Sequence, residues 1–211
     1  MGSTPTTPAK KSHILMCDFF ILQIINMNHL FNSSILLIFI PTIIICILFI
    51  PIISNNQDFI ISNKDFIWPT PGYKTITCPF GPRKSPATGA STFHTGIDIG
   101  APVGSEIHSI CDGKVTYTGF KGADGFTIII ENSIYQIIYG HLDPNYIIKE
   151  NQFIKQNELI AYVGPKYVYN IPNNPYHDNY GPTNGATTGP HLHITIKKDD
   201  ELIDPSSILP I

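Results

Sequence analysis

The sequence predicts an all-β domain, an antiparallel β-sheet or sandwich, preceded by one N-terminal transmembrane helix. Three observations lead to this fold class. After residue 68, short segments rich in β-branched and aromatic residues alternate with Gly, Pro, Asn and Asp turn signals. After residue 60, the apolar residues show no amphipathic helical pattern. Before residue 54, a long uncharged run has the composition and length of a helix that spans a bilayer.

The charged residues are few and unevenly distributed. They make up 14% of the 211 residues, well below the usual share of about a quarter. Residues 1–60 contain only Lys10, Lys11, Asp18 and Asp58, so the other charges give residues 61–211 the surface of a globular domain. The net charge is −3 and no basic run exceeds two residues, which argues against nucleic-acid binding through phosphate neutralisation.

The predicted membrane segment reads ILLIFIPTIIICILFIPII from residue 35 to residue 53. Thr42 is its only polar residue, and about 20 residues suffice to cross a bilayer core of about 30 Å. A buried core helix would usually show one polar face, which this run lacks. We therefore assign residues 1–33 to an N-terminal cytoplasmic or juxtamembrane segment, residues 34–53 to a transmembrane helix and residues 54–67 to a polar linker.

The orientation of this segment follows from its flanking lysines. Lys10 and Lys11 precede the apolar run, and the first basic residue after it is Lys64. The positive-inside rule then places the N-terminus in the cytoplasm and residues 68–211 outside the cell, on a single-pass anchor in the cell membrane. The alternative is a secreted domain released by signal cleavage. No small-residue cleavage site directly follows the run, which favours an uncleaved anchor.

The C-terminal part divides into short predicted strands. Asp112-Gly113 and Asn132-Ser133 each predict a hairpin turn between two of them. Residues 165–188 are rich in Pro, Asn, Gly and Tyr and predict a long ordered loop. The expected strands are Lys74–Cys78, Glu106–Cys111, Lys114–Thr118, Phe126–Glu131, Ile134–Tyr139, Glu158–Val163, His191–Lys197 and Glu201–Ile203.

The segment from His191 to Ile196 places two imidazoles on one face of a strand. Residues two apart share a face, so His191, His193 and Thr195 lie opposite the apolar Leu192, Ile194 and Ile196. Two neighbouring imidazoles gain little from each other and repel if both are protonated. A shared metal ion, proton or substrate explains the pair better.

His94 and Asp98 complete a set of metal ligands. Their four-residue spacing also keeps both side chains on one face of an extended chain, with Gly96 between them. Two histidines and a carboxylate supply the three protein ligands of a hydrolytic zinc site, which keeps one position open for water. His141 and the remaining histidine of the pair are candidates for the general base or the oxyanion donor. The spacing leaves open which of His191 and His193 binds the metal.

Six motifs, and the order in which they follow one another, resemble those of the lysostaphin/LytM-type zinc metallopeptidases of the M23 peptidase family. The resemblance spans roughly residues 68–208. The motifs are the opening strand with its Phe-Gly-x-Arg turn at Cys78–Arg83, the block Phe93–Gly100, the hairpin Asp112–Val115, the Tyr-x-His-Leu block Tyr139–Leu142, the His-Leu-His block Thr188–His193 and the closing Asp204-Pro205.

The resemblance implies an M23-like peptidase domain over residues 68–211 with one Zn²⁺ ion. It implies His94, Asp98 and His193 as the metal ligands, with His141 and His191 as catalytic histidines that do not bind the ion. The implied function is a membrane-anchored zinc endopeptidase that hydrolyses peptide bonds in bacterial cell-wall peptidoglycan. The alternatives are a catalytically inactive scaffold or activator of another hydrolase, and a metal-dependent carboxypeptidase or amidase acting on the same polymer.

The sequence also departs from the family pattern. Asn151 and Asn157 stand where Gly is usual, and Asn tolerates the left-handed backbone conformation better than most residues. The loop 165–188 is much longer than the usual link. It is expected either to form a wall of the substrate cleft or to be a passive insertion. The tyrosines that would contact substrate are Tyr167, Tyr169, Tyr176 and Tyr180.

For three other side chains the sequence leaves two interpretations open. Cys78 and Cys111 either form a disulfide, as an extracellular location would allow, or remain free thiols. Arg83 either helps to shape the cleft or is a solvated, fold-stabilising residue.

Overall fold

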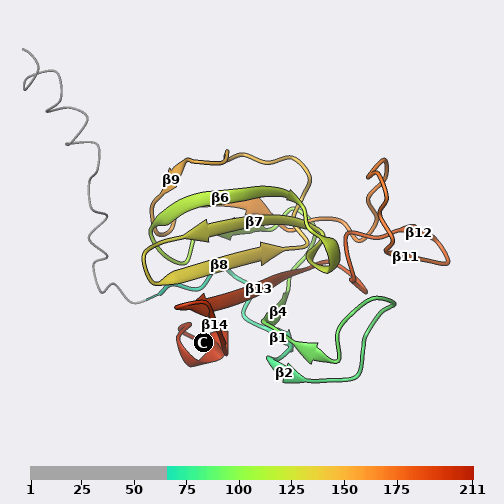
Figure 1. The fold of residues 1–211 in the computed structure, drawn as a ribbon, viewed down its shortest axis with the longest axis horizontal. Coiled ribbons are helices and arrows are strands. Elements are labelled where there is room, and N and C mark those ends of the chain that lie inside the picture. The colour runs from blue at the N-terminus through green and yellow to red at the C-terminus, as the bar shows by residue number, and fades with distance from the viewer. Residues whose placement is uncertain (1–65) are drawn as a thin grey trace, which may run out of the picture. The chain divides into compact units, whose positions relative to one another are not determined.

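The computed structural model describes residues 66–211, which form an all-β fold of antiparallel strands (Figure 1). The predicted N-terminal segment, the transmembrane helix and all but the last two residues of the linker lie outside the described residues. Within residues 66–211, no helix has the length and apolar character needed to cross a membrane. The all-β prediction is therefore confirmed for the described part of the chain, whereas the anchor stays a prediction.

The described strands are short, and most have two to six residues. Two 3-10 turns, η1 (Gly122–Asp124) and η2 (Pro205–Ser207), lie among them. The strands are β1 (Ile76–Cys78), β2 (Gly81–Pro82), β3 (Phe93–His94), β4 (Ile97–Gly100), β5 (Glu106–His108), β6 (Gly113–Phe120), β7 (Phe126–Glu131), β8 (Tyr135–Gly140), β9 (Phe153–Ile154), β10 (Leu159–Tyr162), β11 (His177–Asp178), β12 (Gly181–Pro182), β13 (His191–Lys198) and β14 (Glu201–Ile203).

One eight-stranded sheet dominates the fold. Its order is β1-β4-β13-β8-β7-β6-β9, and β14 pairs with β13 outside this path. Strands β4 and β13 are distant in sequence but adjacent in the sheet, with His193 opposite Asp98. The sheet therefore brings together the two segments that sequence analysis assigned to one metal site.

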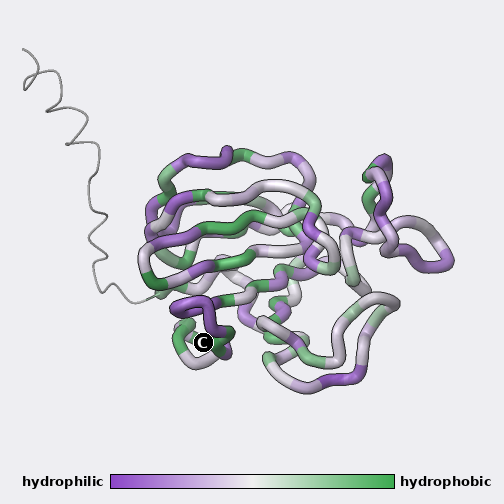
Figure 2. The backbone as a smooth tube through the Cα atoms, in the orientation of Figure 1, coloured by the Kyte–Doolittle hydropathy of each residue, from purple (hydrophilic) through white to green (hydrophobic). Residues whose placement is uncertain are grey.

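The hydrophobic core lies against one face of this sheet. Along β13, Leu192, Ile194 and Ile196 are fully buried in one core cluster, as the alternation of the sequence predicts. A second, two-stranded sheet of β5 and β10 contributes Ile107 and Ile160 to the same cluster. Figure 2 shows the apolar residues concentrated along the inner strands and the hydrophilic residues in the connecting loops.

One predicted hairpin is confirmed and one is wrong. Strands β7 and β8 pair across the Asn132-Ser133 turn. Asp112-Gly113 does not close a hairpin, because β5 pairs with β10 whereas β6 pairs with β7 and β9. The chain instead passes from the small sheet to the large one at this point. A Cβ on Gly113 would lie 2.5 Å from Ile130 Cγ2, so this glycine serves close packing.

The two asparagines at unusual positions adopt the left-handed conformation. Asn151 and Asn157 both have φ of 68°. Each turn keeps its backbone hydrogen bond, from Gln152 N–H to Lys149 O at 3.1 Å and from Glu158 N–H to Lys155 O at 3.1 Å. Both residues thus adopt the left-handed conformation that Asn tolerates better than most residues, and the two turns are preserved.

Two projections flank one end of the large sheet (Figure 1). The first is the loop between β2 and β3, residues 83–92, and the second is the loop 165–188 with its small β11–β12 hairpin. Tyr176 connects them, since a Cβ on Gly89 would lie 2.7 Å from its ring. Strand β13 begins between the two projections (Figure 1).

Gly96 allows β3 and β4 to approach β13, which generates a stability prediction. A Cβ at this position would lie 2.1 Å from the backbone oxygen of Ile194. Because this neighbour is backbone, Gly96→Ala should lower the free energy of unfolding by about 1–3 kcal/mol, measured by chemical denaturation. Gly189→Ala is the matched control, since a Cβ there meets nothing within 4 Å. Equal stability of the two variants would contradict this role of Gly96.

Candidate metal centre

A row of residues crosses four strands of the large sheet at the end where the loops project. Cys78 on β1 pairs with Asp98 on β4, Asp98 pairs with His193 on β13, and His193 pairs with Gly140 on β8. Directly opposite residues in antiparallel strands point to the same face. A Cβ on Gly140 would lie 3.0 Å from the backbone oxygen of Asp124, so the glycine allows the Asp124 backbone to approach closely beside the row.

His94 reaches this row from a separate strand. Residues four apart in a straight strand lie about 13 Å apart, yet His94 Nε2 lies 3.1 Å from Asp98 Oδ1. The chain turns between β3 and β4 at Thr95-Gly96, where Gly96 packs against the Ile194 carbonyl. The expectation of a shared face in one extended segment was therefore incomplete, because the bend brings the two side chains together.

Three donor atoms converge at this point. His94 Nε2 lies 3.0 Å from His193 Nδ1, and Asp98 Oδ1 lies 3.1 Å from the first atom and 2.9 Å from the second. Ligands at 2.0–2.1 Å from a tetrahedral zinc ion are separated by about 3.3 Å. The spacing of the three atoms thus fits one small cation with little adjustment.

The outer nitrogens of the two imidazoles are held by hydrogen bonds. His94 Nδ1–H donates to the Pro79 carbonyl at 2.8 Å, so Nε2 carries the lone pair. His193 Nε2 lies 2.9 Å from Thr195 Oγ1, which can accept its proton and leave the Nδ1 lone pair facing inward. Two lone pairs and a carboxylate oxygen repel one another unless a cation or a proton lies between them. This donor set fits zinc, with outer hydrogen bonds of the kind that orient metal-binding histidines.

Asp98 is the electrostatic centre of the cluster. Its Oδ1 also lies 3.4 Å from His191 Nε2, while its Oδ2 lies 3.6 Å from Arg83 Nη1. Burial alone would raise the pKa of Asp98, but the close contacts of its carboxylate with the imidazoles of His191, His193 and His94 outweigh burial and hold the pKa well below the ordinary value. The carboxylate is therefore ionised at neutral pH, as a metal ligand must be.

His141 and His191 lie beside the three donors. Their ring centroids are 4.6 Å apart in an edge-to-face arrangement. His141 Nδ1–H donates to the Asn184 carbonyl at 2.7 Å, and His191 Nδ1–H donates to the Gly189 carbonyl at 2.8 Å. Burial, followed by the nearby charges of His191 and His193, lowers the pKa of His141 well below 6.5. His141 is therefore a neutral imidazole with a free Nε2 lone pair.

The backbone of His141 is in an unfavourable conformation for a residue with a side chain. Its φ is 57°, in the left-handed region. Its N–H donates to the Asp124 carbonyl at 2.7 Å, and its own carbonyl accepts from Gly164 N–H at 3.0 Å. These two hydrogen bonds fix the imidazole at the site despite the conformational cost.

Asn184 positions His141 and was missed by sequence analysis. It is fully buried, and its backbone carbonyl accepts the hydrogen bond from His141 Nδ1–H. Its side chain donates to the Leu142 carbonyl at 3.0 Å and accepts from Phe126 N–H at 2.8 Å. The sequence offers only the Asn184-Gly185 dipeptide, which predicts a turn and gives no sign of these contacts.

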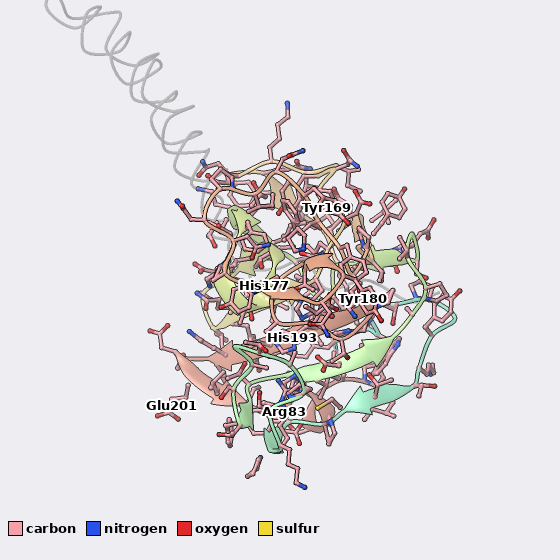
Figure 3. All side chains as sticks on the ribbon, turned by 90° about the vertical axis from the view of Figure 1, so that its right-hand side faces the viewer. Arg83, Tyr169, His177, Tyr180, His193 and Glu201 are labelled. Atoms are coloured by element: carbon pink, nitrogen blue, oxygen red, sulfur yellow. The ribbon has the colours of Figure 1, made fainter. Side chains whose placement is uncertain are left out.

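A cavity of about 310 Å³ opens over the cluster. Figure 3 looks onto this end of the molecule, where His193 lies between Arg83 and Tyr180 in the view. The loop 165–188 contributes Ala186 and Thr188 to the lining, and the loop after β2 contributes Arg83. The cleft-shaping interpretation of Arg83 is thus the one that the structure supports.

None of the four tyrosines suggested as substrate contacts lines this cavity. Tyr167 donates to Asp178 Oδ2 at 3.1 Å, and Tyr176 packs near Gly89. Tyr169 and Tyr180 are 62% and 83% exposed. The loop therefore reaches the cavity with its C-terminal end, whereas its aromatic residues brace the two projections or face solvent.

Cys78 and Cys111 are both free thiols. Cys111 belongs to the hydrophobic core, and burial, together with Asp112, raises its pKa to about 12. Cys78 instead lines the cavity. The disulfide that sequence analysis considered is not formed, because the two residues occupy different environments.

Comparison with known proteins agrees with this arrangement. Residues 92–177 match the model of peptidase family M23, a segment that includes His94, Asp98 and His141. The peptidoglycan DD-endopeptidase ShyB of Vibrio cholerae is 33% identical over 63% of this chain and 27% of its own length. The DD-carboxypeptidase/endopeptidase Mpg of Neisseria meningitidis is 29% identical over 64% of this chain and 27% of its own length.

A solved structure agrees as well. The crystal structure of a zinc-containing peptidase from Vibrio cholerae superimposes with a TM-score of 0.53 and 32% identity, covering 67% of this chain and 39% of that one. The chain spans about a quarter of the length of the two curated relatives. Family match, relatives and fold agree, and together they confirm the resemblance of this chain to the M23 peptidase family.

Proposed function

We propose that this chain is a zinc-dependent endopeptidase that hydrolyses peptide bonds in bacterial cell-wall peptidoglycan. The observation that carries the proposal is the convergence of His94 Nε2, Asp98 Oδ1 and His193 Nδ1 within 3.1 Å of one another. The substrate class is supported by the curated relatives, one of which is named a peptidoglycan DD-endopeptidase. The complete donor set favours an active enzyme over an inactive scaffold.

In this proposal His94, Asp98 and His193 hold the zinc ion. When bound there, the ion would polarise the scissile carbonyl and lower the pKa of a water molecule in its open position to about 7. The geometry also favours His193 over His191 as the third ligand, since His193 Nδ1 is 2.9 Å from Asp98 Oδ1 and His191 Nε2 is 3.4 Å from it.

The other two histidines, His141 and His191, have different roles in this proposal. His141 is neutral, and its free Nε2 can accept the proton of the attacking water as a general base. His191 Nδ1–H donates to the Gly189 carbonyl, and its Nε2 lies 3.4 Å from Asp98 Oδ1, beside the three donor atoms. We assign to His191 the stabilisation of the developing oxyanion.

We further propose that residues 34–53 anchor the enzyme in the cell membrane with the peptidase domain outside. The support is the uncharged run itself and the lysines that precede it, Lys10 and Lys11. The alternative remains secretion after cleavage of this segment. In both cases the domain reaches an extracellular polymer.

A carboxypeptidase activity is the second candidate. The Neisseria relative is named a DD-carboxypeptidase/endopeptidase, and both reactions hydrolyse a peptide bond. Muropeptides released from purified cell walls separate them: an endopeptidase converts cross-linked dimers to monomers, whereas a carboxypeptidase shortens the stem peptide.

Substitutions at four of the five central residues should separate metal binding from catalysis. Asp98→Ala and His193→Ala should lose both the zinc and the cell-wall hydrolysis, because each removes a metal ligand. His141→Ala and His191→Ala should keep most of the zinc and lose activity by about 10²–10⁴-fold. Zinc content is measured by elemental analysis and activity by zymography with and without a chelator.

His177→Ala is the matched control, because His177 is an exposed histidine whose Nδ1 contacts only the Pro175 carbonyl at 3.1 Å among the described residues. It should keep zinc and activity. Normal turnover in His191→Ala would remove the proposed donor role, and normal zinc content in Asp98→Ala would remove the proposed ligand set.

The lowered pKa of His141 predicts a specific pH dependence of stability in the metal-free chain. Because the folded pKa lies below the unfolded value near 6.5, this group's contribution is fully present above pH 6.5 and is lost as the pH falls. The dependence is at most about 1.4 kcal/mol per pH unit. His141→Gln should flatten the decline below pH 6.5, measured by denaturant unfolding, whereas His177→Gln should not. If the free energy of unfolding falls equally with pH in the wild type and in His141→Gln, the proposed role of His141 in this pH dependence is contradicted.

A further inference from the structure

Cys78 lies at the metal centre, although no motif assigned it a role there. It is directly opposite Asp98 in the pairing of β1 with β4, so both side chains point to the same face. Its Sγ, a ring nitrogen of His94 and a carboxylate oxygen of Asp98 all lie within 4.8 Å of one another. The thiol also lines the cavity over the three donors.

Arg83 holds the sulfur in this position. Arg83 Nη1 donates to Cys78 Sγ at 3.1 Å and lies 3.6 Å from Asp98 Oδ2. One guanidinium therefore contacts both the thiol and the carboxylate of the metal centre.

The chemistry of the four groups suits a closed zinc site. Thiolate is a preferred zinc ligand with a bond of about 2.3 Å, and a sulfur and a nitrogen bound to one tetrahedral zinc lie about 3.6 Å apart. Cys78 Sγ, the His94 nitrogen and the Asp98 oxygen lie within 4.8 Å of one another, so the Cys78 side chain must rotate toward His193 to reach an ion that all four groups share. Four protein ligands would occupy every tetrahedral position and leave none for water.

We propose that Cys78 is a reversible fourth protein ligand, whose thiolate closes the open position and keeps the enzyme latent. The inference rests on the proposed zinc site. On closure the S–H bond breaks, its proton passes to solvent, a sulfur–zinc bond forms and the bound water leaves. Opening is the reverse, with water and a proton taken up from solvent. Arg83, which contacts both Cys78 Sγ and Asp98 Oδ2, would compensate the thiolate charge in the closed state.

Cobalt substitution of the full chain, purified in mild detergent, tests this ligand directly. Co²⁺ bound by the centre gives visible ligand-field bands, and a sulfur ligand adds a near-ultraviolet charge-transfer band. The wild-type chain should show both. Cys78→Ser should keep the visible bands and lose the charge-transfer band. Cys111→Ala is the matched control and should keep both, because Cys111 lies in the core.

A second measurement does not depend on the variants. In the wild-type chain, alkylation of the Cys78 peptide, followed by mass spectrometry, should slow when zinc is added, because a metal-bound sulfur is a poorer nucleophile. The Cys111 peptide should show no such change. Visible bands without a charge-transfer band, or equal alkylation of Cys78 with and without zinc, would overturn the Cys78 proposal and leave the three-ligand site standing. Failure to bind cobalt at all would overturn the proposed zinc site and the Cys78 ligand together.

Discussion

The site depends on one constraint, which is that electron pairs of two imidazoles and one carboxylate are forced to face one another. His94 is oriented by the Pro79 carbonyl and His193 by the Thr195 hydroxyl. Both outer hydrogen bonds turn the opposite nitrogen toward Asp98. Such an arrangement is costly without positive charge at its centre. A divalent cation removes this cost, and its binding energy is then coupled to the fold through the hydrogen bonds that orient the ligands.

The β-sheet supplies the precision that this constraint requires. Strand β13 uses its apolar residues for the core and its alternate residues, His193 among them, for the site. The cross-strand pairing of Asp98 with His193 fixes two of the proposed ligands on rigid elements. The proposed third ligand, His94, depends instead on the bend at Thr95-Gly96, and the proposed base, His141, on its own left-handed backbone conformation. The long loop 165–188 reaches the site through the buried Asn184, whose backbone carbonyl accepts a hydrogen bond from His141, whereas Tyr169 and Tyr180 of the same loop are exposed.

Sequence reasoning predicted the all-β class and the inward face of β13, because alternation of apolar residues is a local signal. It could not decide between His191 and His193, since both share a face and only the strand register distinguishes their distances to Asp98. It misassigned Asp112-Gly113 as a hairpin, because whether β5 pairs with β6 or with β10 depends on packing between two layers. The roles of Asn184 and Cys78 depend on contacts across the fold, which no local pattern records.

Nitrogen NMR of the full chain, labelled with ¹⁵N in its histidines, tests the shared-cation site most directly. The structure predicts that zinc shifts the nitrogen signals of His94 Nε2 and His193 Nδ1, so the two rings bind through different nitrogens. His94 Nδ1 should stay protonated and keep its hydrogen bond to the Pro79 carbonyl. His94→Gln and His193→Gln assign the two signals. Zinc binding through the other nitrogen of either ring, or no zinc-dependent shift at either residue, would contradict the account.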